Sequence, residues 1–118
     1  MSDGKAQGKE LEAPAPLGSL VDYQEGSVVS RTLVKNRSGS VTLFAFDRGQ
    51  AISEHTVPYE ALVMVLDGSG EFTVGGKKHV VTTGSVLLMP ASVPHAVTAP
   101  SRFKMALTML KEDSGDRS

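Results

Sequence analysis

The chain has 118 residues, a formal net charge of −1, 40% hydrophobic and 21% charged residues, and no cysteine. This length and composition are typical of one ordinary globular domain with a modest core. The charge gives no electrostatic reason to expect nucleic acid or an anionic membrane as a partner. The lack of cysteine excludes disulfides, thiolate catalysis and cysteine-based zinc sites.

The first 17 residues are polar and end in Ala13-Pro-Ala-Pro-Leu17, which offers too little apolar surface to become ordered. We therefore expect a flexible arm over residues 1–17, a single domain over residues 18–111 and a flexible tail over residues 112–118. Ser19–Gln24 predicts one short helical turn with Ser19 as its N-cap. The hydrophilic start lacks the apolar region of a signal peptide, and no apolar run reaches the ~20 residues of a membrane span, so we expect a cytoplasmic protein.

From Ser27 onward, β-branched residues recur in short runs separated by Gly, Pro, Asn and Ser, which predicts an all-β sandwich or barrel. Gly75-Gly76 is the strongest turn signal, because a primed two-residue turn needs positive φ angles. With this pair as the loop, Phe72 pairs with His79. The expected strands are 28–34, 40–47, 51–57, 61–66, 71–74, 77–82, 85–89, 95–99 and 103–110.

Two segments with regularly spaced Gly, Pro and His, residues 49–68 and 84–99, resemble the two signature motifs of the cupin superfamily. Those motifs read G-x5-H-x-H-x(3,4)-E-x6-G and G-x5-P-x-G-x2-H-x3-N. The residues in register are Gly49, His55, Gly68, Gly84, Pro90 and His95. The residues that replace the second His, the Glu, the Gly and the Asn are Val57, Ala61, Ser92 and Ala99. The resemblance covers about residues 27–110 and extends to small single-domain bacterial cupins of the cupin 2 conserved barrel type.

The resemblance implies an antiparallel cupin-type β-barrel (a double-stranded β-helix, or jelly roll) that commonly pairs as a dimer. Several of the expected strands, such as 61–66 and 86–89, are apolar on both faces. Since an antiparallel sheet usually turns one face to water, such strands need a second surface to cover them. We therefore predict a homodimer.

The two-residue period of a strand puts Ser53 and Val57 on the same face as His55. The family register implies that Ala61, Val63 and Val65 face inward on the next strand, and that Val97 and Ala99 join His95. The predicted pocket is therefore apolar, with two imidazoles and one hydroxyl. Its lining residues are Ser53, Val57, Ala61, Val63 and Val97. His79 also faces inward if Phe72 does, although its place near a hairpin end favours a structural role over that of a third ligand.

A divalent metal is the first candidate cofactor. Zinc, iron, manganese and nickel sites built on imidazole normally need three protein ligands, and the family resemblance implies three His and one Glu. Only His55 and His95 remain, because Val57 and Ala61 have no electron pair to donate. The two imidazoles would hold a metal weakly, or together with a bidentate substrate. The alternative is that both are hydrogen-bonding groups of a metal-free pocket.

The two histidines could also work as acid and base toward an enolisable or hydroxylated small molecule, since imidazole exchanges protons near neutral pH. No carboxylate is expected in the pocket to orient either ring, which favours binding over catalysis. Two functions remain. One is a module that binds a small molecule, and the other is a small enzyme of the isomerase, lyase or metal-assisted oxygenase type that uses His55, His95 or both.

Overall fold

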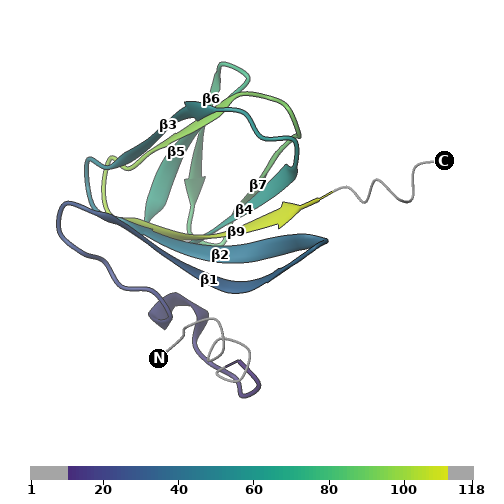
Figure 1. Cartoon of the computed structure of the whole chain (residues 1–118). Coiled ribbons are helices and arrows are strands. Elements are labelled where there is room, and N and C mark those ends of the chain that lie inside the picture. Colours follow the sequence, from purple (N-terminus) through teal and green to yellow (C-terminus); the bar gives the residue numbers. More distant parts are fainter. Residues whose placement is uncertain (1–10, 112–118) are drawn as a thin grey trace.

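The computed structural model describes residues 11–111. These residues fold into two antiparallel β-sheets that together form a barrel (Figure 1). The five-stranded sheet has the order β1-β2-β9-β4-β7 and the four-stranded sheet the order β3-β8-β5-β6. The strands are β1 (Val28–Asn36), β2 (Gly39–Phe46), β3 (Ala51–His55), β4 (Glu60–Asp67), β5 (Ser69–Val74), β6 (Lys77–Thr82), β7 (Val86–Met89), β8 (His95–Thr98) and β9 (Phe103–Leu110). The predicted all-β barrel is confirmed, and each strand overlaps one that the sequence predicts.

Two tight hairpins set the register of the sheets. Asn36 and Gly39 pair across the β1–β2 turn, and the Asn36 side-chain oxygen accepts hydrogen bonds from the backbone N–H groups of Ser38 (2.8 Å) and Gly39 (3.2 Å). At the β5–β6 turn, Gly75 and Gly76 have φ angles of +57° and +82°, as a primed turn requires. The predicted pairing of Phe72 with His79 is confirmed.

Three phenylalanines form the centre of the core between the sheets. Phe46, Phe72 and Phe103 are fully buried. The rings of Phe46 and Phe103 are stacked with centroids 4.6 Å apart, and the edge-on contact of Phe72 with Phe103 spans 6.0 Å. Phe103 lies so close to Gly70 of β5 that a Cβ there would come within 2.6 Å of its ring. The two sheets therefore meet here in a close-packed aromatic contact, which is possible only because residue 70 has no side chain.

The outer face of the five-stranded sheet is partly covered by the chain's own N-terminal segment, residues 11–27, which Figure 1 shows beneath β1 and β2. Leu20 and Tyr23 pack against a second buried cluster. The members of this cluster are Val21, Leu33, Leu43, Ala45 and Ala106. The N-terminal segment of the same chain therefore supplies part of the surface that buries the outer face of these strands.

The helical turn in this segment differs from the prediction. A 3-10 helix spans Leu17–Ser19, so that it ends where the expected turn begins. The Ser19 hydroxyl does not cap a following helix; it donates backward to the Pro16 carbonyl at 2.8 Å. Leu11 packs against the second cluster, while the flexibility expected of residues 1–10 and 112–118 lies outside the described residues. In residues 11–111, no helix has the length and apolar character needed to cross a bilayer.

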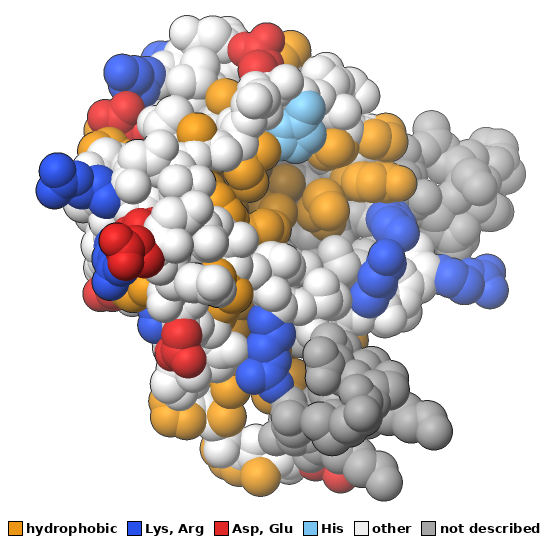
Figure 2. Space-filling model, turned by 60° about the vertical axis from the view of Figure 1, so that its left-hand side comes forward, with side chains coloured by type: hydrophobic (Ala, Val, Ile, Leu, Met, Phe, Trp, Pro, Cys, Tyr) orange, Lys and Arg blue, Asp and Glu red, His pale blue; other side chains and the backbone are white. Residues whose placement is uncertain are grey.

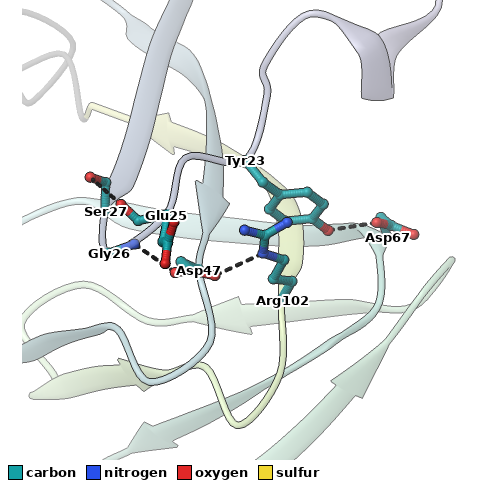
Figure 3. A network of polar contacts seen from close by, with 7 residues as sticks. All are labelled: Tyr23, Glu25, Gly26, Ser27, Asp47, Asp67 and Arg102. Atoms are coloured by element: carbon teal, nitrogen blue, oxygen red, sulfur yellow. Dashed lines mark hydrogen bonds and ion pairs between the residues drawn. The ribbon is translucent and has the colours of Figure 1, made fainter.

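A polar network anchors the segment to the end of β4 and to the β2–β3 and β8–β9 loops (Figure 3). The Tyr23 hydroxyl donates to Asp67 at 2.5 Å. Asp47 accepts from the Arg102 guanidinium at 2.7 Å and from the Gly26 N–H at 2.6 Å. The hydrogen bond from Arg102 is the largest of the effects that lower the pKa of Asp47 to about 2, and burial followed by the bond to Asp67 raises the pKa of Tyr23. The segment is therefore held by hydrogen bonds as well as by apolar packing.

The Gly70–Phe103 contact generates a test of the core. We expect Gly70→Ala to lower the free energy of unfolding by about 1–3 kcal/mol, because the added methyl group would overlap the Phe103 ring. Gly18→Ala is the matched control, since a Cβ at Gly18 would meet nothing within 4 Å. Urea denaturation followed by circular dichroism measures both. Equal stability of the two variants would contradict the contact.

Candidate functional site

His55 and His95 lie side by side at one end of the barrel. His55 is the last residue of β3, His95 is the first residue of β8, and the two pair directly across the strands. Their ring centroids are 4.4 Å apart and the rings meet edge to face at 67°. His95 is buried, with 5% of its surface exposed, while His55 is exposed. The pair therefore reaches from the interior of the barrel to solvent.

The two imidazoles are held in the same way by the backbone. The Nδ1 atom of His55 lies 2.9 Å from the carbonyl oxygen of Ser53, and that of His95 lies 3.3 Å from the carbonyl oxygen of Val93. A carbonyl oxygen only accepts hydrogen bonds, so each Nδ1 carries the proton. In the neutral ring, each Nε2 then presents a lone pair, which is the form that binds a metal or accepts a hydrogen bond.

A β-bulge in β3 changes which residues share a face with His55. Ile52 pairs with Val97 and His55 pairs with His95, so three steps along β3 match two steps along β8. The extra residue breaks the two-residue period on which Ser53 was expected to face inward. Ser53 is exposed, and Ile52 packs against the main core instead. Sequence reasoning missed Ile52, for which the only signal was its apolar side chain.

The other residues expected in the pocket lie at different depths. Ala61, Val63 and Val97 are buried in the main core, as are Val65 and Ala99. Val57 is half-buried in the loop after β3. The buried and half-buried residues expected in the pocket are therefore apolar, and the deeper of them are part of the packed core.

The loop before β8 positions His95. Ser92 has a φ angle of +65°, the left-handed conformation that glycine adopts most readily, at the place where the cupin motif has glycine. Its N–H donates to the Val57 carbonyl at 2.8 Å, and the Pro94 carbonyl accepts from Gly75 at 2.8 Å. These two backbone bonds connect the loop to the β3–β4 loop and to the β5–β6 turn.

Burial lowers the pKa of His95, and the charge that His55 could carry lowers it further, while the hydrogen bond to the Val93 carbonyl opposes both effects. A lowered pKa means that the neutral ring is favoured at neutral pH. His95 is therefore an electron-pair donor rather than a cation under ordinary conditions.

Among residues 11–111, no group of three or more His, Cys, Asp or Glu side chains is placed to hold a metal ion. His79 is half-buried on β6, two strands away from β8 in the order of the sheet. Glu54 and Glu60 are exposed. The pair of imidazoles thus has no third protein ligand in the described part of the chain.

The surface around this end of the barrel is concave. Figure 2 shows a hollow in which hydrophobic side chains gather, with a histidine at its edge. A cavity of about 400 Å³ also lies at the rim formed by the β3–β4 loop, the β7–β8 loop and the end of β9. Its lining residues are Pro58, Glu60, Ala91, Leu110 and Lys111.

The sequence profile of the cupin domain family matches residues 42–110. A conserved protein of unknown function from Streptococcus pyogenes has a similar structure, with a TM-score of 0.82 and 34% identity over 86% of this chain and 89% of that chain. A cupin superfamily protein from Desulfitobacterium hafniense DCB-2 has a TM-score of 0.81 and 32% identity over 86% of this chain and 93% of that chain. No protein with a curated description matches the chain.

A cupin 2 conserved barrel domain protein from Leptotrichia buccalis is 40% identical, with a TM-score of 0.78 over 80% of this chain and 46% of that chain. The profile match includes most of β2 and all of β3 to β9, and it contains both His55 and His95. The two-sheet barrel, the profile match and these neighbours agree, and the chain belongs to the cupin family.

Proposed function

We propose that the protein is a module that binds a small molecule at the His55–His95 pair. The observation that carries this proposal is the contact of the two rings, 4.4 Å apart, with both Nδ1 atoms bound to backbone carbonyls. Two preorganised polar groups beside an apolar wall are what a small-molecule site needs, because the apolar wall supplies affinity and the polar groups supply orientation. The ligand would place its polar end on the imidazoles and its apolar body against side chains such as Ile52 and Val57.

Cupins commonly hold a divalent metal, and the His55–His95 pair offers only part of the ligands that such a metal needs. The pair supplies two neutral nitrogen ligands, but Val57 and Ala61 supply none, and the described residues contain no third candidate beside the pair. Since metal sites of this kind need at least three protein ligands, the residues do not fit a resident metal. A zinc, iron, manganese or nickel ion would be held weakly, by His55 and His95 together with a chelating ligand.

The alternative function is that of a small enzyme using the same histidines. General acid–base catalysis by histidine usually relies on a further group that orients the ring. Here a backbone carbonyl orients each ring, and the neighbouring glutamates Glu54 and Glu60 are exposed. This arrangement favours binding, and a measurement of turnover on any ligand found separates the two functions.

The binding proposal is tested with a fragment library and nuclear magnetic resonance. We expect fragments with an apolar body to shift the Hε1 signals of His55 and His95, and we expect His55→Ala and His95→Ala to weaken their binding at least tenfold. His79→Ala is the matched control, because His79 lies two strands away from β8. For an enzyme, the same two variants would instead lose turnover while retaining most of the binding.

Absence of any fragment that shifts these signals would contradict the binding proposal. Fragments that bind equally well to the wild type and to both alanine variants would contradict the role of the pair, even if they bind elsewhere on the barrel.

The metal comparison generates a second prediction. We expect the double variant Val57→His/Ala61→Glu to bind about one nickel or zinc ion per chain, because it restores the four donors of the cupin motif. The wild type should hold well under one ion per chain after dialysis, as measured by elemental analysis. The variant with Ala61→Gln in place of Glu is the control, since it adds a side chain of similar size without the carboxylate. A wild type that retains a full equivalent of metal would overturn this account.

We also propose a homodimer, supported by an apolar patch on the outer face of the five-stranded sheet. Met64 lies opposite Val86 and Leu62 opposite Leu88, all on the face away from the core. Val86 and Leu88 are 58% and 50% exposed. The N-terminal segment covers the cluster on β2 and β9, whereas β7 is an edge strand whose apolar side chains stay exposed. A second copy of the chain would cover this patch and the edge together.

The dimer is tested by light scattering at micromolar concentrations. We expect the wild type to have twice the 12.4 kDa mass of the chain, and Leu88→Glu to be monomeric because a buried charge would oppose the contact. Val80→Glu is the matched control, since Val80 is 61% exposed on the other sheet, and it should remain dimeric. A monomeric wild type would refute the dimer, and a dimeric Leu88→Glu would refute its location.

A further inference from the structure

We infer that the ligand's polar end is a neutral group with two adjacent hydroxyls that donate hydrogen bonds to His55 and His95, and that it is not an anion. This inference rests on the proposed binding function and adds the chemical class of the ligand. It follows from the direction of the hydrogen bonds that hold the two rings, from their proximity, and from the charges on the strands around them.

The first step is the tautomer of the rings. Both Nδ1 atoms point to the carbonyl oxygen of the residue two positions earlier, Ser53 for His55 and Val93 for His95. Because an oxygen without hydrogen cannot donate, the backbone holds the proton on Nδ1 in both rings. Each Nε2 therefore accepts rather than donates as long as the ring is neutral.

Turning the Nε2 atom of either ring into a hydrogen-bond donor is unfavourable. An anion such as a carboxylate or phosphate requires hydrogen-bond donors, so at least one ring would have to become an imidazolium. His95 is 5% exposed, and burial disfavours its charged form. The two rings are also in contact, with centroids 4.4 Å apart, so that a second charge would be repelled by the first. Both facts oppose an anionic ligand.

The third step concerns the charged groups around the pair. Val74 of β5 lies opposite His95 of β8 on one side and opposite Lys77 of β6 on the other. Cross-strand partners share a face of the sheet. The side chain of Lys77, and that of His79 two residues further along β6, therefore lie on the same face as the His55–His95 pair. Lys77 is exposed at the hairpin end, two strands and therefore roughly 10 Å away. The other titratable side chains of β3, β5, β6 and the start of β4 are Glu54, Glu71, Lys78 and Glu60.

None of these four groups forms an ion pair or a hydrogen bond with either ring. Glu71 and Lys78 form an ion pair with each other at 3.6 Å, while Glu54 and Glu60 are exposed. Among residues 11–111, no ion pair or side-chain hydrogen bond joins either ring to a carboxylate or to a cation, so a charged ligand would meet no partner that is already bound to the pair. A neutral ligand avoids this cost, because an uncompensated charge is expensive next to an apolar wall.

The pair offers two hydrogen-bond acceptors, which matches a ligand with two donors. Two acceptor nitrogens on rings that touch suit two donors on neighbouring atoms of one ligand, as in a vicinal diol. An isolated hydroxyl would satisfy one ring and leave the other acceptor without a ligand partner. The apolar residues beside the pair, Ile52 and Val57, then contact the carbon chain that carries the diol.

The tautomer is tested on the protein without any ligand. Long-range proton–nitrogen correlation spectra of ¹⁵N-labelled protein at pH 8 distinguish Nδ1–H from Nε2–H rings. We expect the Nδ1–H pattern for His55 and His95, whereas a histidine free in water prefers Nε2–H. The Nε2–H pattern in both rings would overturn the inference, whatever binds to the pocket.

The chemical class is tested with two probes of equal chain length, 1,2-hexanediol and hexanoate, at the same pH. We expect the diol to shift the Hε1 signals of His55 and His95 and to bind at least tenfold more tightly than hexanoate. The preference should disappear in His55→Ala and His95→Ala and persist in His79→Ala. Equal or tighter binding of hexanoate would overturn the inference.

The two proposals fail in different ways. If neither probe binds, the head groups of the fragments that bind in the library screen decide, and a predominance of anionic fragments refutes the diol while leaving the binding function intact. If no fragment binds at all, the binding function fails, and the ligand class that rests on it falls with it.

Discussion

The pairing of β3 with β8 is the constraint on which the candidate site depends. One extra residue between Ile52 and His55 shifts the register, so that His55 lies opposite His95 while Ile52 still packs against the core. Without this bulge, the alternation along β3 would turn either His55 or Ile52 away from the interior. The bulge therefore reconciles a continuous core with a pair of imidazoles at the end of the barrel.

The chemistry of the pair follows from what surrounds it. The rings are oriented by backbone carbonyls rather than by carboxylates, and their neighbours in the motif, Val57 and Ala61, are apolar. Such a site retains the electron-pair donors of two cupin ligands and replaces the other two donors with apolar surface. We regard this exchange as a change from holding a metal to holding an organic ligand, which is the basis of the proposed function.

The five-stranded sheet shows how one chain distributes apolar surface. Its strands β4, β7 and β9 are apolar on both faces, and the N-terminal segment covers part of the outer face through Leu20, Val21 and Tyr23. Hydrogen bonds from Tyr23 to Asp67 and from Gly26 to Asp47 hold that cover in place (Figure 3). The remaining exposed residues on β7 form a separate patch, so the proposed association with a second copy would add to the internal cover rather than replace it.

The sequence by itself determined the β architecture, the nine strands, the glycine hairpin and the two histidine motifs, because these depend on local alternation, on turn residues and on short spacings. It also indicated the need for cover on the outer face, but not that residues 11–27 would supply part of it. Only the tertiary structure decided that Ile52 rather than Ser53 takes the inward position, that Ser19 bonds backward to Pro16, and that backbone carbonyls orient both imidazoles. These features depend on a bulge and on contacts between segments far apart in the chain, and local periodicity contains no information about either.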